Sequence, residues 1–427
     1  MATIREPSRE IPVVKDVDVV VVGGGPAGFV AATAAARLGA SVVLVERYGY
    51  LGGLATGGLV LFMDVIGDRQ GNRIIGGLFW EIMERLRAMK GVVFEAPLRP
   101  YIDSERLKVV ADTLCLEAGV ELRLHSWGVK AIVEDGRLRG VVVESKSGRQ
   151  ALLGKVCIDA TGDGDIAALA GAEYELGYQR IGLNLKAGGI DRDRFQAFER
   201  DDPERARDLR AQVRSLGGFP FRPLPTPDSH AGIYWINILG LASRKGGGCD
   251  EGSIHQIYAG ELSAIDVEDL SYAEVELRRR LMTSSEFHRA NVPGFEGLRL
   301  LSFASQLGVR ESRRITGVHV LTREEVLARR RFDDAIGMAG LGFSPVGHYQ
   351  VPYGCLVPCQ VDGLLVAGRC IGTDHWIQQS ARLIPPAMMT GQAAGTAAAL
   401  AVKEGVDPRN LDPAPLRQQL TADGVIF

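Results

Sequence analysis

Two stretches near the start of the chain are continuous apolar runs of the kind that form buried strands. Asp18 is followed by four valines, and residues 41–45 repeat the pattern. Because neither run alternates with polar residues, we expect both strands to be covered on two faces, as in a parallel sheet. Between them, the small residues from Pro26 to Leu38 predict a helix that ends at Gly39. The pattern predicts a strand, a tight turn, a helix and a second strand.

The turn between the first strand and the helix carries glycines at fixed offsets. Gly23, Gly25 and Gly28 fit G-x-G-x-x-G. These glycines permit a tight turn, close approach of a pyrophosphate and close helix–strand packing, and the helix N-terminus would bind the diphosphate. Glu46 ends the second strand 18 residues after Gly28. Its carboxylate can bind a ribose hydroxyl and would repel a 2′-phosphate, so the pattern predicts a dinucleotide site and disfavours NADP.

The pattern then continues with further helices and strands. A helix is expected over 76–91, and another is expected to begin at a capping Asp103 or Ser104. A D-G pair at 135–136 lies between two alternating runs and predicts a hairpin. Residues 155–159 predict one more strand, with a glycine-rich exit.

The pattern of charged and apolar residues along the chain changes twice. From about residue 173 to about 346, charged helical stretches alternate with a proline-rich link. A buried strand with a glycine turn and a small-residue helix, entered by Pro385 and Pro386 and closed near Gly405, then return. We predict an α/β fold in which a Rossmann-like domain with a parallel sheet is interrupted by a second α+β substrate domain. The expected ranges are 1–174 and 347–427 for the nucleotide domain and 175–346 for the second domain.

Composition narrows the class of protein. The 427 residues carry a net charge of -3 with 24% charged residues, so the chain has no excess of basic residues of the kind that binds nucleic acid. The charged, proline-broken N-terminus and the absence of a long apolar run predict a cytoplasmic protein that does not bind membranes. The six cysteines lack zinc or C-x-x-C spacing, so we expect no metal and no disulfide.

Four stretches carry a family resemblance: GGGPAGFVAATAAARLGASVVLVERYGYLGG, DATGDGDIAALAGAEYELG, RESRRITGVHVLT and VPYGCLVPCQVDGLLVAGRCIG with SARLIPPAMMTGQAAGTAAALA. They resemble the FAD-dependent oxidoreductase family with the glutathione-reductase-type FAD fold. The resemblance covers both ends of the chain and is weak over roughly 175–300. It implies that the dinucleotide is FAD, not NAD.

The resemblance also implies which residues contact FAD. Arginine at position 369 departs from the wider pattern, in which many relatives carry aspartate for the ribityl chain. The helix entered at Pro386 would direct its N-terminal dipole toward the flavin, with backbone N–H groups of two methionines beside it. The implied set is Gly23, Gly25, Pro26, Ala27, Gly28, Glu46, Arg47, Gly53, Leu54, Val129, Thr161, Gly162, Asp163, Gly368, Arg369, Pro386, Met388 and Met389.

Two absences limit the redox chemistry. The loop over 50–60 has no cysteine, so the redox disulfide of disulfide reductases with this fold is missing. The glycines at 337–342 follow a charged helical stretch instead of a strand, so a dedicated NAD(P)H domain is not expected. The substrate itself is then expected to exchange electrons with the flavin.

Candidate catalytic residues gather late in the chain. His348 and His375 can exchange protons near neutral pH, and Arg382 can hold a carboxylate, a layout that resembles fumarate reductase relatives. Tyr349 is a candidate substrate contact. Arg310 is another, because it would share one face of a presumed strand with Ser312 and Arg314. The alternatives are a hydrogen-bonded structural role for each histidine, neutralisation of phosphate or flavin charge by Arg382, and an ion-paired sheet surface that includes Arg310.

Three functions remain open on this evidence. The first is an FAD-dependent dehydrogenase or oxidase that transfers a hydride between a small polar, anionic or neutral, organic substrate and flavin N5. The second is an FAD-carrying electron-transfer subunit whose partner supplies the substrate site. The third is a reductase that borrows NADH transiently. An electron-acceptor protein and a second copy of the chain, as a homodimer, are the partners considered.

Overall fold

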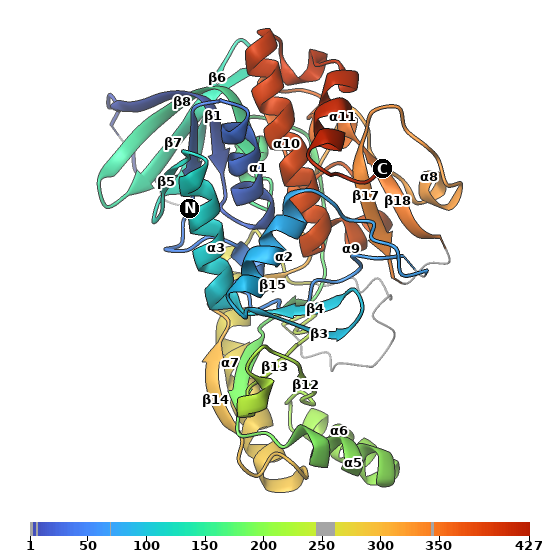
Figure 1. The fold of residues 1–427 in the computed structure, drawn as a ribbon. Coiled ribbons are helices and arrows are strands. Elements are labelled where there is room, and N and C mark those ends of the chain that lie inside the picture. The colour runs from blue at the N-terminus through green and yellow to red at the C-terminus, as the bar shows by residue number, and fades with distance from the viewer. Residues whose placement is uncertain (1–2, 6, 69, 245–260, 343–345) are drawn as a thin grey trace.

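In the computed structural model of the protein, residues 3–5, 7–68, 70–244, 261–342 and 346–427 are described. A seven-stranded sheet forms the larger part of the molecule (Figure 1), with strand order β5-β2-β1-β8-β7-β6 and β19 beside β8. The pairs β2–β5, β1–β2, β1–β8 and β8–β19 are parallel, whereas β6–β7 and β7–β8 are antiparallel. The strands are β1 Val13–Val22, β2 Val42–Val45, β5 Glu121–Arg123, β6 Trp127–Glu134, β7 Arg137–Ser145, β8 Gly148–Asp159 and β19 Leu364–Val366.

The parallel strands end in one line. Val22 pairs with Val45 on one side and with Asp159 on the other, and Asp159 also pairs with Val366. Strand β8 therefore lies between β1, from near the N-terminus, and β19, from near the C-terminus, and all three end at the same edge of the sheet. The predicted hairpin at the D-G pair is confirmed, and β8 begins seven positions before the predicted Lys155 because its first half pairs with β7.

Two helices from opposite ends of the chain pack against each other on this sheet. Helix α1 (Pro26–Arg37) lies beside α10 (Ile384–Glu404) in Figure 1, and both confirm the predicted helices. A Cβ atom on Gly391 or Gly395 would come closer than 3.0 Å to the backbone carbonyl of Ala27 or Ala31, respectively. The glycines of α10 therefore let two helices approach at backbone distance.

Other helices surround this core. The predicted helix at 76–91 is α2 (Leu78–Ala88), and α3 (Ser104–Glu117) begins after Asp103, whose side chain accepts a hydrogen bond from the Arg106 N–H. A hairpin of β17 (Ala335–Leu341) and β18 (Gly347–Pro352) and the last helix, α11 (Pro413–Ala422), pack on α10. Within the described residues, no helix is long and apolar enough to cross a membrane.

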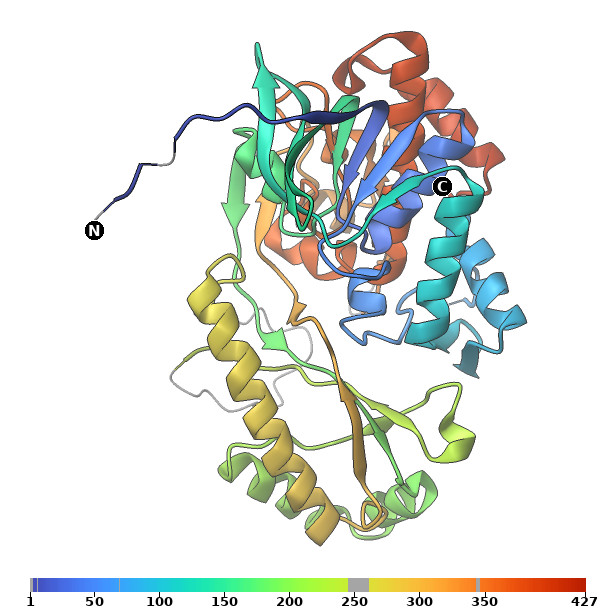
Figure 2. The ribbon, with the colours of Figure 1, turned by 90° about the vertical axis from the view of Figure 1, so that its left-hand side faces the viewer.

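A second hydrophobic core lies beside the first (Figure 2). It is built on the antiparallel sheet β12-β13-β11-β14, with the long helix α7 and the pair α5 and α6 around it. The charged sequence at 191–216 thus forms two helices, separated at Asp202. The elements are β11 Leu185–Gly188, α5 Arg192–Asp201, α6 Pro203–Ser215, β12 Pro223–Leu224, β13 Tyr234–Ile236, α7 Val267–Asn291 and β14 Arg299–Phe303.

The second core suggests where the second domain begins and ends. Beyond position 175 its members run from Ile181 to Val309, whereas buried residues from Ile315 onward, including Leu321 and Val326, belong to the first core. We therefore propose that the chain returns to the nucleotide domain near residue 310, earlier than the predicted residue 347.

The single strand expected to contain Arg310, Ser312 and Arg314 is interrupted in the structure. Residues 310–312 lie between two short strands, β15 (Gly308–Val309) and β16 (Arg313–Ile315), and are not a continuous strand. Arg310, Ser312 and Arg314 consequently do not share a regular face. Arg314 is buried and pairs with Glu311 and Glu175, because the chain turns there to meet β9 (Tyr174–Leu176).

His288 makes the second core sensitive to acid. Its Nδ1 donates to the Ser284 carbonyl, its Nε2 accepts from the Phe221 N–H, and burial lowers its pKa to about 4. Since the folded pKa lies below the ordinary value of about 6.5, this contribution to stability is present above pH 6.5 and is lost as the pH falls toward 4.

We expect His288→Gln to reduce the pH dependence of the unfolding free energy. Between pH 7 and pH 5 the native protein should lose about 2 kcal/mol more than the variant. Denaturant unfolding at several pH values measures this difference. Replacement of the exposed His230 with glutamine is the control, and an equal slope in His288→Gln and the native protein would contradict the assignment.

Candidate functional site

A cavity of about 510 Å³ lies at the carboxyl ends of the parallel strands. This volume is within the range of roughly 300–1,000 Å³ that is usual for small-molecule sites. Its walls are the turn after β1, the end of β2, the loop after β8, the segment 367–369 after β19, the first turn of α10 and the start of α7. The cavity is thus formed by both ends of the chain together with the second core.

Glycines of the first turn fill two different needs. Gly23 has a φ of +99°, and a Cβ on it or on Gly28 would come closer than 3.0 Å to a backbone carbonyl, of Ala160 and Gly23 respectively. Gly25 has a φ of -68° and open space where its Cβ would lie. Because Gly25 lines the cavity, this open space belongs to the site and suits the approach of a ligand to the backbone.

Glu46 closes one end of the cavity. Its carboxylate accepts hydrogen bonds from the Gly24 N–H at 2.6 Å and from the Tyr48 N–H at 2.8 Å, and burial raises its pKa. The Arg47 guanidinium lies 4.9 Å from the Tyr48 ring centroid and 5.5 Å from that of Trp127. This end of the cavity offers the Glu46 carboxylate to a ribose, with the aromatic rings of Tyr48 and Trp127 beside it.

Asp159 holds the loop that follows β8. It is fully buried, accepts hydrogen bonds from the Thr161 N–H, the Thr161 hydroxyl and the Ala167 N–H, and burial raises its pKa to about 6. The loop is thereby fixed where Thr161, Gly162 and Asp163 line the cavity.

Arg369 ties that loop to the C-terminal part of the chain. Its guanidinium pairs with the Asp163 carboxylate at 2.6 Å and donates to the carbonyls of Gly162 and Val309. The side chain that departs from the family pattern therefore has its donors occupied by the protein. It joins residues 162–163, 309 and 369 into one wall.

The first turn of α10 offers few N–H groups. Pro385 and Pro386 have none, and the Ala387 N–H is bonded to the Leu383 carbonyl. Met388 and Met389 follow inside the helix, where their N–H groups enter the helical hydrogen bonds. The expectation that these two methionines present free N–H groups to the flavin is therefore not supported, and Ile384 is the residue of this turn whose N–H can do so.

Arg382 immediately precedes this turn and faces the cavity. It is partly buried and lines the cavity. Within the described part of the chain its Nε has no hydrogen-bond partner. Burial, with repulsion from Arg310 and Arg369, lowers its pKa to about 9. The cavity lining thus includes a guanidinium whose buried Nε lacks an acceptor among the described residues.

The other candidate catalytic residues lie outside the cavity lining. The Nδ1 of His375 is 2.8 Å from the Glu311 carboxylate, and its Nε2 has no partner among the described residues. His348 pairs across the β17–β18 hairpin with Gly340, away from the lining. The Tyr349 hydroxyl bonds Ser380, and its burial raises its pKa. Arg310 donates to the carbonyls of Arg180 and Leu239.

Most of the implied FAD contacts line the cavity. Exceptions are Gly28, which packs under the turn, and Val129, Pro386, Met388 and Met389, which lie next to lining residues or deeper in α10. Sequence reasoning missed the start of α7 and the segment 306–309, because their contacts with the turn are long-range. It also missed Glu311, a buried carboxylate that bonds His375, Gln179 and Arg314. The predicted residues that line the cavity are Gly23, Gly25, Pro26, Ala27, Glu46, Arg47, Gly53, Leu54, Thr161, Gly162, Asp163, Gly368, Arg369 and Arg382, and residues that the prediction did not include, such as Val267, Leu270, Ser271, Gln306, Leu307, Val309 and Ala387, also line it.

A glycine turn, a strand-terminal acid and a cavity at the carboxyl ends of parallel strands define a dinucleotide-binding α/β protein. The model of the FAD-dependent oxidoreductase family matches residues 18–420. The chain belongs to this family; it is an FAD-dependent oxidoreductase and its cofactor is FAD.

Several characterised proteins share part of the sequence. The tRNA uridine 5-carboxymethylaminomethyl modification enzyme MnmG of Wolinella succinogenes is 34% identical over 33% of this chain and 24% of its own length. Digeranylgeranylglycerophospholipid reductase 1 of Methanopyrus kandleri is 33% identical over 34% of this chain and 39% of its own. The chain thus covers only about a quarter to two fifths of these two relatives. A geranylgeranyl bacteriochlorophyll reductase-like structure from Thermoplasma acidophilum, 15% identical, aligns over 96% of this chain and 83% of its own with a TM-score of 0.48.

Proposed function

We propose that the protein transfers a hydride between FAD and a small polar organic substrate that carries an anionic group. When bound, FAD supplies a ring that exchanges a hydride at N5. The residues of the β1–α1 turn, Glu46 and the loop 161–163 are proposed to hold its adenosine diphosphate half. The flavin half is proposed to lie toward Gly53, Gly368 and the first turn of α10, since these residues line the other parts of the cavity.

The proposal rests on one observation, the position of the Arg382 side chain in the cavity lining. A buried guanidinium nitrogen without an acceptor among the described residues is unfavourable, and an anion in the cavity would supply the acceptor and the opposite charge. Arg310 and Arg369 add positive potential beside it. A planar carboxylate is the group that a guanidinium binds best, through two parallel hydrogen bonds. The substrate class that fits is therefore a small carboxylic acid.

Proton exchange is proposed for His375. The Glu311 carboxylate fixes one ring nitrogen and favours the proton on Nδ1, which leaves Nε2 as the nitrogen able to accept one. Glu311 is in turn held by Gln179 at 3.0 Å and by Arg314. Neither histidine lines the cavity, and His375 is preferred to His348 because it bonds Glu311, whose negative charge acts on Arg382.

The experiment is an anaerobic screen of the FAD-loaded protein against small acids, amines and alcohols, read as bleaching of the flavin absorbance. We expect carboxylic acids to bleach it. If dithionite bleaches the flavin and none of these compounds or NADH does, the chain is instead an electron-transfer subunit that needs a partner. Bleaching by NADH alone would support the reductase.

Arg382→Gln should raise KM for the carboxylic acid about 10- to 100-fold, the loss of one charge-assisted hydrogen-bond pair. Arg382→Lys should recover part of the loss, because it restores the charge without the fork. Steady-state kinetics measure this, with FAD content determined for each variant. The exposed Arg207→Gln is the control. If Arg382→Gln lowers FAD affinity and leaves KM unchanged, Arg382 serves the cofactor and the substrate role is wrong.

A further inference from the structure

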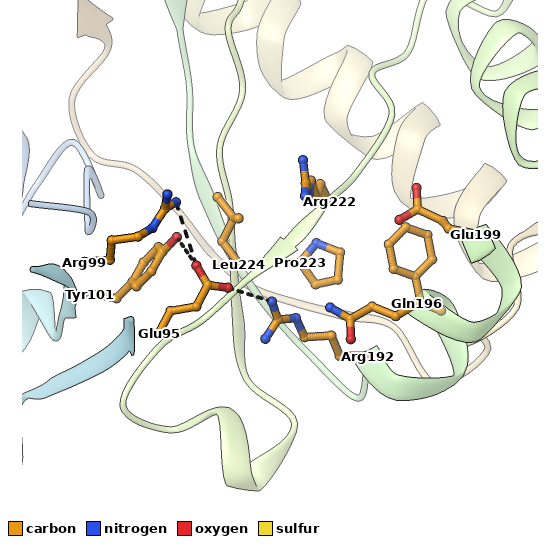
Figure 3. A pocket seen from close by; sticks show the side chains of 10 residues that line it. Glu95, Arg99, Tyr101, Arg192, Gln196, Glu199, Arg222, Pro223 and Leu224 are labelled. Atoms are coloured by element: carbon orange, nitrogen blue, oxygen red, sulfur yellow. Dashed lines mark hydrogen bonds and ion pairs between the residues drawn. The ribbon is translucent and has the colours of Figure 1, made fainter. Parts of the chain in front are cut away.

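A second hollow lies in the molecule, apart from the cavity and without a lining residue in common with it. We call it the arginine hollow (Figure 3). It is bounded by the hairpin of β3 (Val92–Ala96) and β4 (Arg99–Ile102), by α5 and by β12, so it joins the first part of the chain to the second core. Its volume is about 160 Å³, which suits a ligand group of a few heavy atoms, since a water molecule occupies about 30 Å³.

Three arginines from three separate segments line the arginine hollow. Arg99 comes from β4, Arg192 from the first position of α5, and Arg222 from the residue before β12. Three cations brought together from distant parts of the sequence repel one another unless an anion lies among them.

Among the described residues that line the hollow, Glu95 is the carboxylate that contacts these arginines. Glu95 accepts from Arg192 at 3.1 Å and from the Tyr101 hydroxyl at 3.2 Å, and lies 3.9 Å from Arg99. Glu199 also lines the hollow, but its carboxylate pairs with Arg210 at 2.8 Å. Among the described residues, Glu95 thus serves Arg192 and Arg99, and no ion pair within 4.0 Å joins it to Arg222.

The described residues that line the hollow also offer more hydrogen-bond donors than acceptors. In the described part of the chain Arg222 forms no ion pair within 4.0 Å, and the Nε of Arg192 is buried without a hydrogen-bond partner. The amide of Gln196, one turn further along α5, adds another donor to the wall. The positive end of the α5 dipole lies at Arg192 and favours an anion at the same place.

We propose that the arginine hollow binds a small oxyanion, a phosphate or carboxylate group, between Arg192 and Arg222. The oxyanion accepts hydrogen bonds from these guanidinium groups and from Gln196, and its charge offsets the excess of arginine. It contacts Glu95 at the opposite wall, and that carboxylate opposes binding. Because the hollow joins the β3–β4 hairpin to α5, the bound oxyanion holds these two parts together.

The experiment measures thermal unfolding of the FAD-loaded protein, in excess FAD, with inorganic phosphate or succinate against sodium chloride at equal ionic strength. A ligand that binds only the folded state raises Tm with its concentration. We expect a saturable rise with phosphate or succinate, and the one that acts at the lower concentration identifies the oxyanion. Chloride should give no saturable rise.

Substitutions in the arginine hollow show whether the rise in Tm comes from binding there. Arg222→Gln should abolish the saturable rise, and because Arg222 is exposed this variant should fold normally. Arg192→Gln should do the same. Arg200→Gln is the matched control on α5, where Arg200 is exposed and pairs with the neighbouring Asp201. Glu95→Gln should lower the concentration for half of the rise, since the opposing charge is removed.

Two results would overturn the proposal. One is the lack of a saturable rise with either oxyanion in the native protein. The other is an equal rise in Arg222→Gln and in the native protein, which would place the binding elsewhere. FAD is present in excess throughout, and each measurement is repeated in an Arg382→Gln background, so that succinate bound at the proposed substrate site of the cavity does not decide either result.

Discussion

Gly391→Val should destabilise the protein by about 3 kcal/mol or more, because its side chain would occupy the space of the α1 backbone. A Cβ at position 391 would lie closer than 3.0 Å to three backbone atoms of Ala27, and a backbone cannot move aside as a flexible side chain can. The helix α10 would have to shift away from α1, and its first turn would leave the cavity. We therefore expect a lower Tm and a lower FAD content, measured by thermal unfolding and by the flavin absorbance.

A matched control separates this effect from the loss of a glycine in general. Gly188, in β11, has ordinary van der Waals space at 3.4 Å from the nearest atom, a side-chain atom of Leu301. Gly188→Ala should change the unfolding free energy by less than about 1 kcal/mol. If Gly391→Val unfolds like the native protein, the close packing of α1 and α10 is wrong.

Gly28→Ala and Gly25→Ala should have opposite outcomes although each adds one methyl group to the same turn. At Gly28 the Cβ would overlap the Gly23 carbonyl, so the variant should be poorly folded. At Gly25 nothing lies within 4 Å, and the φ of -68° suits alanine, so the FAD-free protein should keep its Tm. The methyl group would instead meet the diphosphate and reduce FAD affinity at least about tenfold, a loss of about 1.4 kcal/mol.

Titration of FAD into the deflavinated proteins, followed by flavin fluorescence, measures the affinities, and circular dichroism measures the folding. Normal FAD affinity in Gly25→Ala would show that the diphosphate does not approach this turn. Such a result would remove the role proposed for the turn while leaving its packing intact.

The sequence predicted the local parts of this fold well. The valine runs, the glycine turn, α1, the D-G hairpin and α10 each depend on periodicity and turn residues within about thirty positions, and such signals are readable along the chain. The return of a buried strand to the nucleotide domain, now β19, followed from the same amino-acid pattern after the second domain, whereas its partner β8 was not predicted. FAD followed from motifs at both ends.

Long-range contacts could not be predicted in the same way. The pairing of Arg369 with Asp163 joins residues 206 positions apart, and the bond of Glu311 to His375 spans 64. The start of α7 reaches the cavity only because the second core folds back over it. The segment 310–314 was wrongly predicted as one strand because alternation cannot show that its residues turn to pair with different partners.

The most direct measurement is the affinity for FAD of a variant altered far from the glycine turn, at Ala387 in the first turn of α10. Ala387 lines the same cavity as Gly25 although 362 positions separate them. We predict that the purified native protein carries FAD. We also predict that Ala387→Leu binds FAD at least about tenfold more weakly, while the Tm of its FAD-free form is unchanged. A colourless native protein that takes up no FAD, or an Ala387→Leu variant with native affinity, would contradict these predictions.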